Sequence, residues 1–253
     1  MAGIVSVGSP DGGLRFTRSS DGVRSFEPAR SIDPSGGPDD RLSVVAAGPN
    51  GLVAVAYYSE PPGRTITVNV ATSTDNGLSF AAHVSLGPVQ WSSSSPGLNL
   101  KTGPALAVDP GSGDIYVSVA TAAPTGGGSE VEVFASHDLG RSWSAPTVAA
   151  VSPSASYFQP QLAVDHHGAV GLEAFELTGG RVQLLMWVST SKGSSFGLAQ
   201  PVTPSPGFDP AISRSVGLGD YQGLAASGAA FHPLWNDTRT GQMELFTATI
   251  PAR

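Results

Sequence analysis

The sequence predicts an all-β protein, a β-propeller built from four-stranded antiparallel blades. Three observations lead to this prediction: a high content of Gly and Pro, an eight-residue motif that recurs along the chain, and a pair of strand-like runs before the motif copies. Gly and Pro together make up 53 of the 253 residues, and both destabilise helix interiors. A mostly helical protein is therefore excluded.

The recurring motif has Ser at position 1, Asp at 3, Gly at 5 and an aromatic residue at 8. Residues 73–80 and 136–143 are complete copies, whereas residues 189–196 carry Ser191 at position 3. Near the N-terminus, residues 9–16 fit every position, but we prefer residues 19–26, with Val23 at position 5, because the residues that follow match those after Trp143. The motif residues we expect to be structural are Asp21, Asp75, Asp138, Gly77, Gly140 and Trp143.

The spacing of the motif indicates repeated blades. The four copies begin at residues 19, 73, 136 and 189, so they are 54, 63 and 53 residues apart, which suits a four-stranded propeller blade with variable loops. A strand-like run precedes the later copies and a shorter one follows, which places the motif in a hairpin turn. There Asp caps turn amides, Gly takes a positive φ, and the aromatic residue wedges between blades.

A second repeated pattern supplies the two inner strands of each blade. The paired runs are residues 42–51 and 52–57, 105–109 and 115–119, 161–168 and 170–175, and 223–228 and 231–235. We expect one propeller domain over residues 1–253, with approximate blades at 1–37, 38–98, 99–153, 154–206 and 207–253. N-terminal strands would complete the last blade and close the ring, because open edges invite aggregation. The alternative is an incomplete six-bladed propeller.

The motif is the Asp-box pattern, and through it the chain resembles the bacterial sialidase-like, BNR-repeat β-propeller superfamily over nearly its whole length. The resemblance implies that the boxes are structural and lie away from the active site. It also implies a glycosidase of the exo-α-sialidase type, with three arginines for a substrate carboxylate, a tyrosine activated by a glutamate, and an aspartate acid/base. The Arg-Ile-Pro string of that family is absent; the nearest strings are residues 29–32 and 63–66, which contain Arg30 and Arg64.

Antiparallel order predicts which end of the propeller carries a site. If the motif turns lie at one end, the starts of the first strands and the ends of the second strands lie at the other, together with polar side chains. The catalytic candidates there are Asp220, Tyr221, Asp237, Asp40 and Glu176. The substrate-binding candidates are Arg41, Arg214 and Arg239, which suit a carboxylate, and Tyr58 and Trp91, of which Trp91 suits a sugar ring. As the structural alternatives, Asp237 pairs with Arg239 and Trp91 anchors its loop.

Composition limits partners and cofactors. The formal charge of −7, with two Lys and eleven Arg, offers no basic surface for a phosphate backbone, so we expect no nucleic-acid binding. The chain has no Cys, hence no disulfide or thiolate ligand, and no apolar run reaches the about 20 residues of a membrane span. We expect no metal or cofactor, although the oxygen-rich loop 109–114 weakly indicates calcium, and His166 and His167 read as turn residues.

Two functions follow from these observations, and the third hypothesis is a structural propeller domain of a larger assembly that has no site. One is a glycosidase acting on acidic glycans, with Asp, Glu, Tyr and Arg side chains on the propeller rim. The alternative is a non-catalytic propeller that binds a glycan or a protein. In either case we expect a monomer with a glycan or another small molecule on the rim. The N-terminal residues lack a signal sequence, so we expect the protein either to stay inside the cell or, if a leader has been removed, to be secreted or at the cell surface.

Overall fold

The computed structural model describes residues 2–7, 13–32, 39–91, 98, 100, 102–124, 126–210, 218–219 and 222–252. These residues form nineteen β-strands and a short 3₁₀ turn, Pro49–Gly51, and they contain no α-helix. Within the same described ranges, no helix is long and apolar enough to cross a membrane.

The strands form five antiparallel sheets that follow the order of the chain. The first sheet contains β1 (Ala2–Val7), β2 (Leu14–Ser19) and β3 (Arg30–Ser31), and the second contains β4 (Asp40–Ala47), β5 (Val53–Ser59), β6 (Ile66–Ser73) and β7 (Val84–Val89). The third contains β8 (Ala105–Val108), β9 (Ile115–Ala122), β10 (Ser129–Ser136) and β11 (Thr147–Ser152). The fourth contains β12 (Ser156–Val164), β13 (Val170–Thr178), β14 (Arg181–Ser189) and β15 (Gln200–Pro201), and the fifth contains β16 (Gly223–Ser227), β17 (Ala230–Asp237), β18 (Glu244–Thr247) and β19 (Ile250–Pro251).

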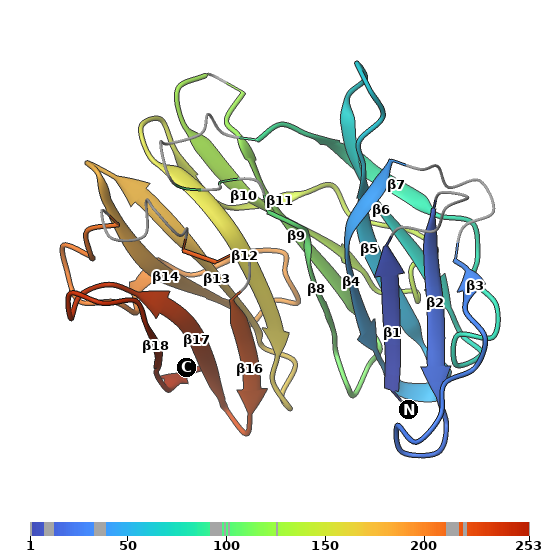
Figure 1. The fold of residues 1–253 in the computed structure, drawn as a ribbon. Helices are drawn as coiled ribbons and strands as arrows, with labels where there is room; N and C mark the ends of the chain where they lie inside the picture. Colours follow the sequence, from blue (N-terminus) through green and yellow to red (C-terminus); the bar gives the residue numbers. More distant parts are fainter. Residues whose placement is uncertain are drawn as a thin grey trace.

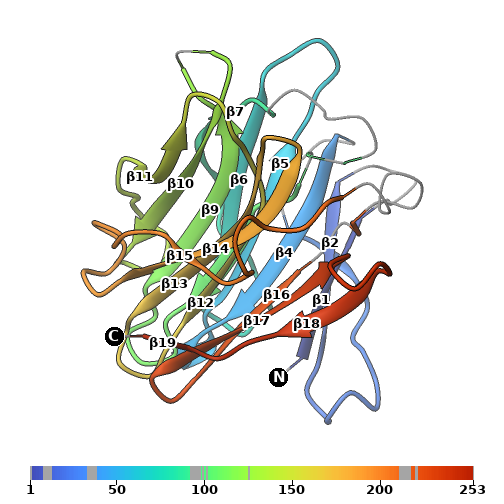
Figure 2. The same cartoon turned by 90° about the vertical axis from the view of Figure 1, so that its left-hand side faces the viewer.

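The sheets are arranged as blades (Figure 1), from the first sheet in blue to the fifth in red. The first strands of neighbouring sheets contact one another in the order β1, β4, β8, β12 and β16. Figure 2 shows the same arrangement with the fifth sheet toward the viewer. The prediction of an all-β fold with four-stranded antiparallel blades is confirmed.

The expected pairing of the N-terminal strands with the last sheet is wrong for the described strands. β1, β2 and β3 pair with one another, whereas β17 pairs with β16 on one side and with β18 and β19 on the other. Pairing of β1 with β2 is favoured over pairing of β1 with the last sheet, because closing a short loop loses less chain entropy than joining the two ends of the chain.

Apolar side chains fill the space between adjacent sheets. Phe16 and Tyr57 pack between the first and second sheets, and Ile115 and Phe134 pack between the second and third. Tyr116, Leu172 and Trp187 lie between the third and fourth, and the fourth and fifth share Phe175, Met186, Phe231 and Trp235. Each interface therefore depends on residues from two blades, and each blade supports the next.

The eight-residue motif folds into the same hydrogen-bonded turn in successive sheets. In residues 73–80, Asp75 Oδ1 accepts hydrogen bonds from Ser73 Oγ (2.7 Å) and from the Ser79 backbone N–H (2.9 Å), and Ser79 Oγ donates to Asp75 Oδ2 (2.5 Å). Asp21 and Asp138 make the corresponding bonds to their own neighbouring serines. The sequence pattern left position 7 undefined. The serine there stabilises the turn by donating hydrogen bonds to the motif aspartate.

The glycine of the motif lets each turn pack against the preceding sheet. Gly77 has a φ of 77°, and a side chain there would overlap the ring of Phe16 in β2. Gly140 and Gly193 similarly face Thr72 and Tyr116 of the preceding sheets. Val23 occupies this position in the first sheet with a φ of 70° and is 58% exposed, so no described side chain crowds it.

We predict that Gly77→Ala destabilises the protein by about 2 to 4 kcal/mol, because it combines left-handed strain with overpacking against Phe16. Gly63→Ala is the matched control: Gly63 has a φ of 69° but nothing within 4 Å, so only the strain of about 1 to 2 kcal/mol applies. Urea denaturation of both variants measures the difference. Equal losses would contradict the packing role of Gly77.

The motif aspartates predict a loss of stability in acid. Hydrogen bonds from Ser142, first from its side chain and then from its backbone, lower the pKa of Asp138 to about 2, compared with about 3.9 in an unfolded chain. This stabilisation is present above the unfolded pKa and is lost as the pH falls through the folded pKa. Asp138→Asn should therefore lower Tm at pH 7 and less so near pH 2, as thermal unfolding at both values will show.

Candidate functional site

The strand register defines one end of the propeller as the site face. Asp40 at the start of β4 pairs with Ser59 at the end of β5, and Tyr157 near the start of β12 pairs with Glu176 near the end of β13. The motif turns lie at the opposite end, where the Asn76 backbone N–H donates to Gly51 O (2.8 Å) in the β4–β5 turn. The site face is thus the end at which β4 and β12 begin and β5 and β13 end.

The second sheet places four predicted residues near this face. Asp40 is buried and accepts a hydrogen bond from Ser59 Oγ. Arg41 is more exposed, and its Nε lies 3.4 Å from Glu60 Oε2. Tyr58 is fully buried, its ring meets Trp91 edge to face at 6.1 Å, and burial raises the pKa of its phenol. Tyr58 and Trp91 therefore pack together as an anchor for the chain after β7.

The fourth sheet contains a tyrosine–glutamate pair. Tyr157 Oη donates a hydrogen bond to Glu176 Oε1 (3.1 Å), and the ring of Trp187 lies edge-on to Tyr157. Tyr157 is only 6% exposed. Burial and then the neighbouring Glu176 carboxylate raise the pKa of the Tyr157 phenol, so the phenol keeps its proton at neutral pH and donates it in the hydrogen bond to Glu176.

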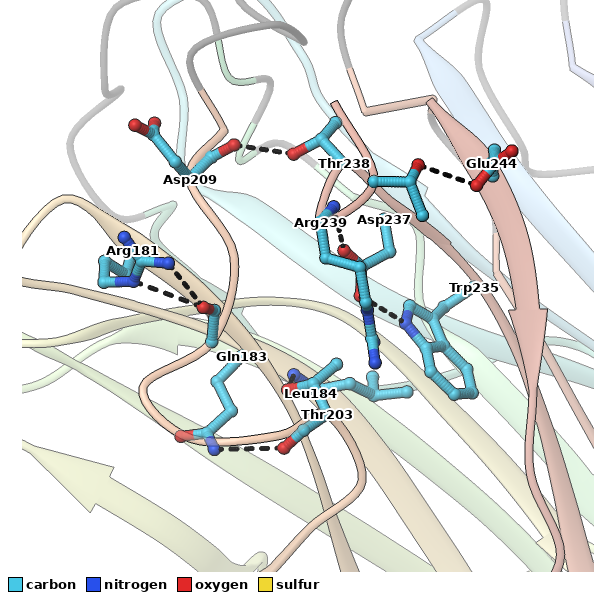
Figure 3. A network of polar contacts seen from close by, with 12 residues as sticks. Arg181, Gln183, Leu184, Thr203, Asp209, Trp235, Asp237, Thr238, Arg239 and Glu244 are labelled. Carbon is cyan, nitrogen blue, oxygen red and sulfur yellow. Dashed lines mark hydrogen bonds and ion pairs between the residues drawn. The ribbon is translucent and has the colours of Figure 1, made fainter. Parts of the chain in front are cut away.

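In the fifth sheet, Asp237 and Arg239 form an internal ion pair (Figure 3). Asp237 is fully buried, and its carboxylate accepts from Arg239 Nε (2.7 Å), the Arg239 backbone N–H (2.8 Å) and Trp235 Nε1 (3.3 Å). The guanidinium of Arg239 also lies 4.4 Å from the centre of the Phe246 ring. All of these contacts lie within one sheet, as in the structural alternative for Asp237.

A small pocket opens beside this ion pair. The chain after β15 is held by Arg181 Nη2, which donates to Gly207 O (2.7 Å), and by Thr238 Oγ1, which donates to Asp209 O (2.6 Å) (Figure 3). The pocket has a volume of about 110 Å³ and is lined by Thr203, Pro204, Ser205, Gly207, Phe208, Asp237 and Arg239. Its size suits a small group rather than an oligosaccharide.

The inner strands of the fourth and fifth sheets meet through glutamine side chains. Gln159 lies in a bulge of β12 with a φ of 51°. Its Nε2 donates to Gly219 O (2.6 Å), and Gln222 Nε2 donates to Gln159 O (3.0 Å). Glu173 of β13 is fully buried nearby, opposite Gln161, and burial raises its pKa well above the usual value.

The structure brings only some of the predicted site residues together at the site face. Arg41 and Arg239 are each bound to carboxylates of their own sheets, and Asp220, Tyr221 and Arg214 lie outside the described residues. In the loop 109–114, Asp109 Oδ1 accepts from the Gly111 and Ser112 N–H groups, and Asp114 contacts Lys192 and His137. Within the described ranges, no group of three or more His, Cys, Asp or Glu side chains could hold a metal ion.

The sequence analysis did not identify Tyr157 or Glu173 as candidate site residues. It also did not predict that the side chain of Gln159 contacts the fifth sheet. Tyr157 lies before the first-strand run at residues 161–168, and the bulge between them shifts the register that places Tyr157 opposite Glu176. Glu173 shows as a charged residue within an otherwise apolar run, which is itself a signal.

The chain is similar in fold to solved glycan-acting propellers. These include an α-L-arabinanase from Penicillium chrysogenum (14% identity, 94% of this chain and 71% of that chain, TM-score 0.61) and an ulvan lyase (13%, 95% and 59%, 0.61). A Hadza microbial sialidase is 16% identical over 85% of this chain and 46% of its own, with a TM-score of 0.55. The chain thus spans less than two thirds of the lyase and the sialidase.

No protein-family model matches the sequence, and no curated protein sequence matches it significantly. At these identities the likeness shows the fold, and it confirms the predicted β-propeller.

The ion pairs predict different stabilities for two arginine variants. Arg239→Ala leaves the buried Asp237 carboxylate without its main partner and should destabilise the protein by about 3 kcal/mol or more. Arg41→Ala removes an exposed pair and should change stability by about 1 kcal/mol or less. Urea denaturation compares the two variants, and a near-neutral Arg239→Ala would argue against a structural role for the ion pair.

Proposed function

We propose that the protein is a glycosidase that acts at the site face, with Tyr157 and Glu176 as its reacting pair. The observation that carries the proposal is the 3.1 Å hydrogen bond from the Tyr157 phenol to the Glu176 carboxylate. A nucleophile and its base within this distance form the arrangement that covalent catalysis requires. The glycan-acting neighbours of the fold support the same class of substrate.

The proposed chemistry starts from the hydrogen bond between the Tyr157 phenol and the Glu176 carboxylate. Glu176 takes the phenolic proton as the Tyr157 oxygen attacks the anomeric carbon, while the bond from that carbon to the leaving oxygen breaks. An acid protonates the leaving oxygen, and water then releases the sugar from Tyr157. For that acid, Asp40 and Asp220 stay predictions from the sequence.

Charge balance favours a neutral glycan over an acidic one at the described part of the site. Arg41 lies beside Glu60 and Asp39, and Arg239 is bound by Asp237. A substrate carboxylate would have to compete with these protein carboxylates for each guanidinium. Recognition of a sialic acid would therefore need a guanidinium other than those of Arg41 and Arg239.

Glycan binding without turnover is the second candidate function. It is favoured by the carboxylates of Asp40 and Asp237, which are buried and occupied by protein hydrogen bonds. Carboxylates that are engaged in this way stabilise the surrounding loops and are poorly placed to transfer protons to a substrate.

We predict that Tyr157→Phe and Glu176→Gln each lower kcat by about 100-fold to 10,000-fold, since each removes one partner of the reacting pair. The assay uses a fluorogenic sialoside, arabinan and ulvan as a panel. Tyr116→Phe is the matched control, because Tyr116 is another buried tyrosine but belongs to the opposite end of the propeller, and it should keep full activity.

Binding measurements on the same panel separate the two candidates. Turnover that is lost in both variants while glycan binding persists supports the glycosidase. Saturable binding by the unaltered protein without turnover on any substrate supports the binding function and contradicts the reacting pair.

A further inference from the structure

The interface between the fourth and fifth sheets contains buried oxygen atoms that find no hydrogen-bond partner among the residues that the structure describes. They are Oε1 and Oε2 of Glu173, Oε1 of Gln159 and Oε1 of Gln222. All four are acceptors when Glu173 is ionised. Since buried polar atoms are almost always paired, this set requires a donor or a cation.

The three side chains come from adjoining segments of the two sheets. Glu173 pairs in register with Gln161, and Gln159 lies in the bulge immediately before Gln161. Gln222 donates to Gln159 O, and Gln159 donates to Gly219 O, so both amide nitrogens are already engaged. Only the amide oxygens are left to contact a further group.

Glu173 differs from the residues at the equivalent position of the second and third sheets. In the second and third sheets the corresponding residues are Ala56 and Ser118, which pair with Val44 and Ala105 as Glu173 pairs with Gln161. Packing at this point therefore requires only a small residue. A carboxylate buried there without a partner is strongly unfavourable unless something compensates for its charge.

A hard cation satisfies this set of atoms better than a proton does. One proton on Glu173 provides a single donor for several acceptors, whereas hard cations prefer several carboxylate and amide oxygens together. Glu173 supplies the charge that exactly one monovalent ion would balance, and a divalent ion would leave an uncompensated charge in a buried site.

We propose that Glu173, Gln159 and Gln222 bind a monovalent hard cation, Na⁺ or K⁺, between the fourth and fifth sheets. The site uses one carboxylate and two amide oxygens. A bound ion would join β12 and β13 of the fourth sheet to the start of β16 in the fifth. The evidence for this site does not include Tyr157 or Glu176, so the proposal holds whether or not these two residues react with a substrate.

Thermal unfolding at constant ionic strength tests the proposal, with choline chloride replaced stepwise by NaCl or KCl. Because a ligand that binds only the folded state raises Tm, the unaltered protein should show a saturable rise with at least one of the two ions. Glu173→Gln keeps the shape of the side chain but removes its charge, and it should abolish the rise. Glu132→Gln is the matched control, since Glu132 is a half-buried glutamate of β10 with a raised pKa, and it should keep the rise.

A second variant keeps the test decisive if Glu173→Gln does not fold. Gln222→Leu removes one oxygen, together with the Nε2 donor to Gln159 O, from a half-buried position, and it should raise the half-saturating ion concentration at least tenfold. The proposal is overturned if Tm does not depend on Na⁺ or K⁺, which would mean that water or a proton satisfies the oxygens. It is also overturned if Glu173→Gln responds as the unaltered protein does, or if only CaCl₂ raises Tm.

Discussion

The packing of each motif turn against the preceding sheet is the constraint on which the rest of the structure depends. Phe80 at the end of one motif meets Phe16 of the first sheet at 5.2 Å between ring centres, and Gly77 leaves room for that contact. The same turn recurs in the next sheets and fixes how far each blade lies from its neighbour. The first motif turn has Val23 in place of glycine. This agrees with the explanation, because no described sheet lies before the first sheet for that turn to pack against.

Regular packing at one end leaves the other end free to vary. The motif turns use the same Ser and Asp hydrogen bonds in three sheets, whereas the site face presents a different set of polar residues in each. A hydrogen-bonded turn that holds the blades in place allows the opposite loops to change without loss of the fold, which is the usual division of labour in scaffolds that carry sites.

The sequence predicted the repeat, the hairpin position of the motif and the end that carries polar residues, because these depend on local turn chemistry and strand alternation. It could not predict side-chain partners, because those depend on register across sheets. The bulge at Gln159 shifts the pairing of β12 with β13 by one residue, and pairing Tyr157 with Glu176 requires knowledge of that register. The expected closure of the ring by N-terminal strands was wrong because a strand count does not show which strands pair.

Strand β13 connects the two inferences about function. Glu173 and Glu176 are three residues apart on it, and because side chains of a strand alternate between its faces, they lie on opposite sides. Glu176 faces the third sheet with Tyr157 and Trp187, and Glu173 faces the fifth sheet with Phe175 and Met186. A cation at Glu173 would hold β13 from the side opposite the reacting pair. The position of Glu176, and with it the geometry of the proton transfer, would then depend on contacts on both faces of a single strand.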